Sequence, residues 1–95
     1  MKELTNAELA ILSLVAERPR HGYEIEQVIE ERGMRDWTEI GFSSIYYVLK
    51  KLERAGLAAG ASEPTERGQT RIVYQATAAG GAALRAAVAD ALSTP

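Results

Sequence analysis

Residues 41–56 constrain the fold most, because they carry the signals that start and stop a helix and a two-faced pattern between them. Ser43 or Ser44 can accept a hydrogen bond from a free backbone N–H group and so serve as the N-cap. Gly56 can adopt the left-handed conformation that ends a helix. At about 100° per residue, one face is apolar and must pack on a core; it comprises Ile45, Val48, Leu49 and Leu52.

The opposite face of this helix is polar and basic. A helix that enters the major groove of DNA needs small polar groups at its tip, donors along its flank and cations for phosphates. An ordinary solvated amphipathic helix shows a similar pattern, so the flanking segments decide between the two interpretations. The outer face holds hydroxyls, an aromatic ring and three cations, with Glu53 set to the side: Ser43, Tyr47, Lys50, Lys51 and Arg54.

Composition sets broad limits on the chain. Its 95 residues, 46% of them hydrophobic, are enough for one compact domain with its own core. The sequence has no cysteine, which excludes disulfides and thiolate metal sites. No apolar run approaches the roughly 20 residues of a membrane span, and no signal peptide is recognisable, so we expect a cytoplasmic protein. The net charge of −2 argues against binding nucleic acid, but residues 41–56 carry three cations against one anion.

Two further helices precede this segment. Residues 5–8 read Thr-Asn-Ala-Glu, the form of a capping box, and Pro19 closes the helix that follows. A second helix is predicted over residues 21–32, with its stop at Gly33. The connector that follows contains Trp37 and Ile40, which we expect to pack on the core. Three helices with short connections, the third bearing exposed cations, predict a helix-turn-helix.

A β-hairpin and a last helix complete the predicted fold. Residues 57–61 are a weak strand candidate, residues 71–76 are a stronger one, and residues 63–70 between them have turn chemistry. A long-looped hairpin directly after such a helix is the wing of a winged helix-turn-helix. Thr77 then resembles an N-cap before an alanine-rich helix over residues 78–92. The predicted class is mainly α with a small hairpin, with residues 1–76 as the DNA-binding domain and 77–95 as a dimerisation element.

No constellation supports an enzyme, a metal site or a cofactor. His21 is the only histidine, and it has neither cysteine nor a carboxylate pair at ligand spacing beside it. We therefore expect a structural or phosphate hydrogen bond from it. Ser43 and Ser44 lack the elbow motif of a nucleophilic serine, and Gly80-Gly81 lacks the spacing of a dinucleotide fingerprint.

The motifs, taken together, resemble those of PadR-type transcriptional regulators. His-Gly-Tyr-Glu opens the second helix at residues 21–24, and the family's pattern for the third helix is matched by residues 44–57. Residues 68–80 resemble the end of its wing and the start of its last helix. The resemblance implies a cytoplasmic dimeric repressor on a two-fold operator, with the third helix in the major groove and the wing on the backbone. Many members are released from DNA by a small molecule, so an unidentified effector is possible.

The chain departs from the family pattern in a few places. Tyr47 stands where the family often has proline, Ala76 replaces a larger aliphatic residue, and Gly81 replaces a common basic one. The chain also ends about fifteen residues after Gly80, which leaves a short final helix. We expect either a minimal member of the family or a DNA-binding domain cut from a longer chain.

These patterns assign candidate DNA contacts. Tyr46 lies at the border of the two helix faces, where it either packs on the second helix or reaches DNA; we expect a packed ring with its hydroxyl outward. Lys51 is placed on the outer face, so that alanine there should spare the fold. The candidates near base edges are Ser43, Ser44, Tyr47 and Lys50. The candidates for the phosphate backbone are Lys51, Arg54, His21, Tyr23, Arg67 and Arg71.

Two other expectations concern partners. The negative net charge keeps open a rival function, a winged helix that binds protein instead of DNA. The first helix also has more apolar surface than one neighbour can cover, and the last helix offers a complementary strip. A weak two-fold dimer would bury both strips. Its predicted contact residues are Leu9, Leu12, Leu84, Val88 and Leu92.

Overall fold

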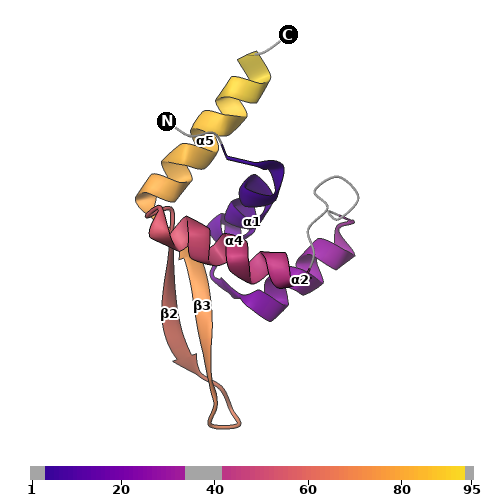
Figure 1. The fold of residues 1–95 in the computed structure, drawn as a ribbon, viewed down its shortest axis with the longest axis vertical. Helices are drawn as coiled ribbons and strands as arrows, with labels where there is room; N and C mark the ends of the chain where they lie inside the picture. The colour runs from indigo at the N-terminus through magenta and orange to yellow at the C-terminus, as the bar shows by residue number, and fades with distance from the viewer. Residues whose placement is uncertain (1–3, 34–41, 94–95) are drawn as a thin grey trace.

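Four helices and a three-stranded antiparallel sheet make up the part of the chain that the computed structural model describes, residues 4–33 and 42–93 (Figure 1). Trp37 and Ile40 lie outside the described residues. The order confirms the expected winged helix-turn-helix with a short C-terminal helix. The elements are α1 (Asn6–Glu17), β1 (Arg20–His21), α2 (Gly22–Glu31), α4 (Phe42–Arg54), β2 (Ala58–Pro64), β3 (Thr70–Ala76) and α5 (Ala78–Ser93).

Helix α1 starts and stops where the sequence predicts. The backbone N–H of Glu8 donates to Thr5 Oγ1 at 3.1 Å, and the N–H of Thr5 donates to Glu8 Oε1 at 2.8 Å. This reciprocal pair is the expected capping box. At the other end, Arg18 is extended, because the residue before Pro19 is pushed away from helical geometry.

The core forms around α1, which contacts α4, α5 and β3 within one chain. Leu12 is fully buried and Leu9 half-buried, so the expectation of an uncovered apolar strip on α1 is wrong. The reason is that three neighbouring elements share its circumference, and Leu12 is thereby unavailable to a second subunit. The buried hydrophobic residues are Ala10, Ile11, Leu12, Leu14, Val15, Ile25, Ile29, Ile45, Val48, Leu49, Leu52, Ala58 and Tyr74.

Helix α4 begins two residues earlier than a cap at Ser43 would place it, and three earlier than a cap at Ser44. It starts at Phe42, so Ser43 and Ser44 lie in its first turn, and their assignment as N-caps is wrong. Its end follows the prediction. Gly56 has φ of +78°, its N–H donates to Glu53 O at 3.0 Å, and the next N–H, of Leu57, donates to Leu52 O at 2.9 Å. These two bonds form a Schellman motif.

The wing is longer, and its loop shorter, than the sequence predicts. Glu63 and Pro64 belong to β2, which leaves only residues 65–69 as the loop. Proline is tolerated there because β2 is an edge strand in the order β1-β3-β2. The two-residue strand β1 is also unexpected; Arg20 and His21 pair with Tyr74 and Val73 of β3. The pairing ties the turn before α2 to the wing.

Helix α5 leaves the body on the side opposite the wing tip (Figure 1). The N–H of Gly80 donates to Thr77 Oγ1 at 3.0 Å, which confirms Thr77 as the cap. Gly80 lies directly over the turn after α4: a Cβ on it would stand 1.9 Å from the Leu57 carbonyl oxygen. The absence of a side chain at Gly80 is therefore what lets α5 start so close to α4. None of the helices among the described residues is long and apolar enough to cross a membrane.

This close approach predicts opposite effects for two adjacent glycines. Gly80→Ala should lower the free energy of unfolding by about 1–3 kcal/mol, because backbone must move to admit the methyl group. Gly81→Ala is the matched control, since its Cβ would meet only the end of the Arg85 side chain, at 3.4 Å. It should raise stability by about 0.5 kcal/mol through helix propensity. Urea denaturation of both variants measures the difference; equal effects would contradict the proposed contact.

Candidate nucleic-acid interface

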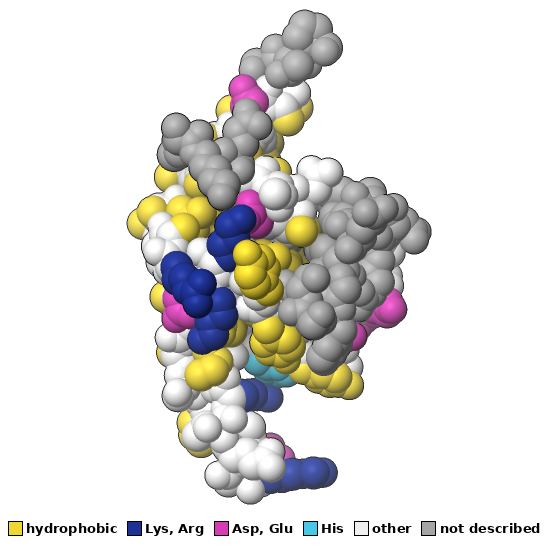
Figure 2. Space-filling view, in the orientation of Figure 1, with side chains coloured by type: hydrophobic (Ala, Val, Ile, Leu, Met, Phe, Trp, Pro, Cys, Tyr) yellow, Lys and Arg dark blue, Asp and Glu magenta, His cyan; other side chains and the backbone are white. Residues whose placement is uncertain are grey.

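One face of α4 is buried and the other is exposed, as the periodicity of the sequence predicts. Ile45, Leu49 and Leu52 are at most 1% exposed, whereas Tyr46 and Tyr47 are 44% and 67% exposed on the other side. Lys50 and Arg54 are exposed as well. Figure 2 shows Lys and Arg side chains gathered over α4 beside hydrophobic ones, with the wing extending below them. The side chains of Ser43 and Ser44 lie outside the described residues, so their role stays a prediction.

Tyr46 locks α4 against the start of α2. A Cβ on Gly22 would lie 2.5 Å from Tyr46 Cε1 and 2.8 Å from its hydroxyl oxygen. The ring therefore packs on the bare backbone of Gly22, as expected, but its hydroxyl lies over Gly22 instead of pointing outward. This contact gives a physical reason for glycine in the His-Gly-Tyr-Glu motif: any larger residue would displace the Tyr46 ring from its place on α2.

His21 and Tyr23 lie at the N-terminus of α2, beside this contact. His21 is the N-cap; its Nδ1 accepts a hydrogen bond from the backbone N–H of Glu24 at 3.2 Å. The structural alternative for His21 is thus confirmed. Its ring lies parallel to that of Tyr23, with centroids 6.5 Å apart. Tyr23 is 57% exposed, and it adds a third tyrosine ring to the surface that holds Tyr46 and Tyr47 of α4.

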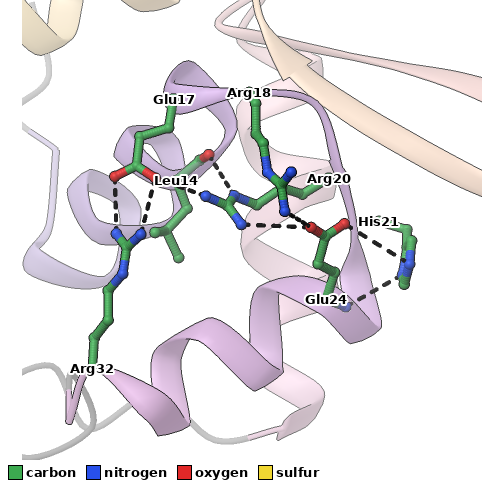
Figure 3. A network of polar contacts seen from close by, with 7 residues as sticks. All are labelled: Leu14, Glu17, Arg18, Arg20, His21, Glu24 and Arg32. Carbon is green, nitrogen blue, oxygen red and sulfur yellow. Dashed lines mark hydrogen bonds and ion pairs between the residues drawn. The ribbon is translucent and has the colours of Figure 1, made fainter.

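A buried arginine joins the end of α1 to the start of α2 (Figure 3). Arg20 is 4% exposed; its Nε donates to Leu14 O at 2.9 Å and its Nη2 to Glu17 Oε1 at 2.7 Å. Its Nη1 lies 3.5 Å from Glu24 Oε2. These partners satisfy the guanidinium, as a buried charge requires. The role of Arg20 could not be predicted from the sequence, because its partners come from two separate helices, α1 and α2.

Glu17 extends this network to the far end of α2. Arg32 donates to both of its oxygens, at 2.9 and 3.1 Å. The hydrogen bonds from Arg32, and then those from Arg20, lower the pKa of Glu17, and the same pair raises the pKa of Arg32. Arg20 thus joins the start of α2 to the end of α1, and Arg32 adds a second, more exposed link from the end of α2 to Glu17.

Lys51 does not lie free on the outer face. Its Nζ is 2.6 Å from Glu8 Oε2 of α1, and the Glu8 side chain is only 6% exposed. Burial alone would raise the pKa of Glu8, but the bonds from Lys51 and Thr5 hold it below its usual value; the pair also raises the pKa of Lys51. The expected placement of Lys51 on the outer face is therefore wrong, and we now predict that Lys51→Ala destabilises the fold, because it would leave the buried Glu8 carboxylate without its partner.

The remaining cations of α4 are more accessible. Lys50 forms a loose, solvent-exposed pair with Glu53 at 3.7 Å. Such a pair contributes little and leaves the ammonium available to other anions. Arg54, in the last turn, makes no ion pair with any residue that the structure describes.

The wing presents one exposed cation at its tip. The N–H of Gly68, whose φ is +78°, donates to Thr65 O at 3.1 Å and closes the turn that carries Arg67. Arg67 has no ion-pair partner within residues 4–33 and 42–93. Arg71 differs, since its Nη2 is 3.5 Å from Glu63 Oε1, directly across the hairpin. Arg67 is thus the stronger candidate for an external anion.

Comparison with known proteins agrees with this geometry. Residues 11–86 match the sequence model of the transcriptional regulator PadR-like family. A candidate transcriptional regulator from Thermoplasma acidophilum has 32% identity and a TM-score of 0.66, with 94% of this chain and 92% of that chain covered. A protein from Streptococcus mutans has 27% identity and a TM-score of 0.74, with coverage of 94% and 80%.

One similar structure contains nucleic acid. It is PadR of Bacillus subtilis in complex with operator DNA, with 26% identity and a TM-score of 0.76. The match covers 93% of this chain but only 47% of that one, so the present chain spans about half of its length. A search of curated proteins gives no match.

The ion pair between Glu8 and Lys51 predicts a pH-dependent loss of stability in Glu8→Gln. Glutamine keeps an oxygen for the capping box but removes the charge. Because the folded pKa of Glu8 is below its ordinary 4.5, its stabilising effect is present above that pH and is lost as pH falls through the folded pKa. At pH 7 the variant should be less stable by on the order of 1–2 kcal/mol.

Thermal denaturation between pH 3 and pH 7 measures this difference, which should narrow in acid. The control is Glu31→Gln, at the exposed end of α2, which removes one carboxylate and leaves the pair intact. A pH-independent difference for Glu8→Gln would contradict the role given to its charge.

Proposed function

Because the chain belongs to the PadR-like family of transcriptional regulators, we propose that it binds duplex DNA with α4 in the major groove. Its family makes it a DNA-binding regulator of transcription and not an enzyme. Bacillus subtilis PadR, whose fold this chain shares, forms a complex with operator DNA, and this supports DNA binding here.

The observation that carries the proposal is the exposed outer face of α4, where Tyr47, Lys50 and Arg54 stand opposite the buried apolar face. The major groove is about 12 Å wide and admits one helix. We assign Ser43, Ser44, Tyr47 and Lys50 to base edges, with Tyr46 packed behind them. Arg54, at the end of the helix, contacts a phosphate.

The surfaces on either side of α4 extend this assignment. Tyr23 and His21, at the start of α2, contact the backbone on one side of the groove. Arg67 and, less strongly, Arg71 contact it through the wing. Such contacts set register and orientation but carry no sequence information themselves.

We further propose a repressor that acts as a dimer on a two-fold operator, with residues 1–76 as its DNA-binding domain and residues 77–95 as its dimerisation element. The support is the outer half of α5, where Val88 and Leu92 are 53% and 82% exposed. Leu84 packs on the core instead, and Leu9 is half-buried. A dimer would set two copies of α4 about 34 Å apart, one helical turn of DNA.

Salt dependence tests DNA binding. Contact with about five phosphates should give a slope near −4.5 when log affinity is plotted against log salt. Arg54→Ala should weaken binding to every duplex and make the slope shallower by about 0.9, with little change in melting temperature. Arg85→Ala on α5 is a control with the same change of charge. Affinity that does not respond to salt, or no binding to duplex DNA, would favour the rival function of a protein-binding module.

Self-association is tested separately, through α5. Val88→Glu/Leu92→Glu should abolish a weak dimer in sedimentation velocity, because charged residues would enter the apolar contact. Binding to a two-half-site operator should weaken, while binding to a single half-site should not change. Ala86→Glu, on the opposite face of α5, is the control. Unchanged sedimentation of the double variant would exclude this surface from the dimer.

A further inference from the structure

We infer that Glu8 is a positioning residue for the DNA-binding helix: it binds Lys51, fixes α4 on α1, and keeps Lys51 out of the contact with DNA phosphates. The inference rests on the proposed DNA-binding function. Of the three cations of α4, Lys51 holds the helix on α1, whereas Lys50 and Arg54 face outward.

Both oxygens of the Glu8 carboxylate are occupied. Oε1 accepts from the backbone N–H of Thr5 at 2.8 Å, and Oε2 lies 2.6 Å from Lys51 Nζ. The first bond holds the carboxylate at the start of α1, so the position of the carboxylate does not depend on its contact with α4. Lys51 therefore binds to a fixed anion rather than to another mobile surface chain.

The pair lies at the edge of the apolar contact between α1 and α4. Leu52, the residue after Lys51, is 1% exposed, and Leu12 of α1 is fully buried. Apolar packing alone resists a small rotation of a helix weakly, because it has no direction. A directional ion pair at the margin defines the rotation of α4, and with it the direction in which Tyr47 and Arg54 face.

The burial of Glu8 makes exchange for a phosphate unfavourable. Its side chain is 6% exposed, so a Lys51 that turned toward DNA would leave a charged oxygen without a partner in a poorly solvated place. Lys50 differs, since both members of its pair with Glu53 are largely in solvent, 60% and 39% exposed. A polar group of DNA can replace Glu53 at little cost, but a phosphate cannot replace Glu8 in this way.

The experiment is the salt dependence of duplex binding for three substitutions. Glu8→Gln keeps the capping oxygen and releases Lys51, so its slope should become steeper by about 0.9, one added phosphate. Lys51→Met should leave the slope of the parent unchanged, whereas Arg54→Met, which removes the cation assigned to a phosphate, should make it shallower by about 0.9. The double variant Glu8→Gln/Lys51→Met should return to the parental slope. Glu31→Gln controls for the added positive charge.

The outcomes separate this inference from the proposed function. A shallower slope for Lys51→Met, or a parental slope for Glu8→Gln, would overturn the role of Glu8 while DNA binding stands. Absence of any salt-dependent binding by the parent would overturn the proposed function itself. Circular dichroism establishes that each variant is folded at the temperature used. If Glu8→Gln does not fold, the comparison of Lys51→Met with Arg54→Met decides.

Discussion

The packing of α4 on α1 is the contact on which the rest of the structure depends. Ile45, Leu49 and Leu52 lose nearly all their exposure in the core that α1 centres, and this burial forces the polar face of α4 outward. This apolar burial supplies most of the stabilisation and sets which face of α4 points outward, but it is not directional and sets the exact rotation of the helix only coarsely. Two contacts at the margins restrict that rotation further, namely Tyr46 on Gly22 and Lys51 on Glu8.

The rest of the helix-turn-helix also combines apolar burial with charged contacts at its margins. Arg20 and Glu17 tie α2 to α1 through charged groups, while Ile25 and Ile29 fill the core beneath. The pairing of β1 with β3 joins this unit to the wing. As a result, the start of α2, the face of α4 and the hairpin are parts of one framework, and the candidate DNA contacts stand on elements whose relative positions are fixed.

Much of the fold could be predicted because its signals are local. The capping box at Thr5, the left-handed Gly56 and the cap at Thr77 each depend on neighbours a few residues away. What could not be predicted depends on residues distant in sequence. The charge pattern of α4 predicted that Lys51 faces outward together with Lys50 and Arg54. Only the packing of α4 on α1 shows that Lys51 pairs with Glu8. The burial of Leu12 likewise depends on three separate elements, so periodicity alone overestimated the surface left for a dimer.

The most direct test of the DNA-binding surface is the change in amide chemical shifts when a duplex from the protein's own upstream region is added. The largest shifts should fall on Tyr47, Lys50 and Arg54, with further shifts at Tyr23 and at Gly68 in the wing turn. Amides at the end of α2, such as Glu31, should move least, because that end is on another side of the framework. The largest shifts at the end of α2, with an unchanged outer face of α4, would contradict the assignment of this surface.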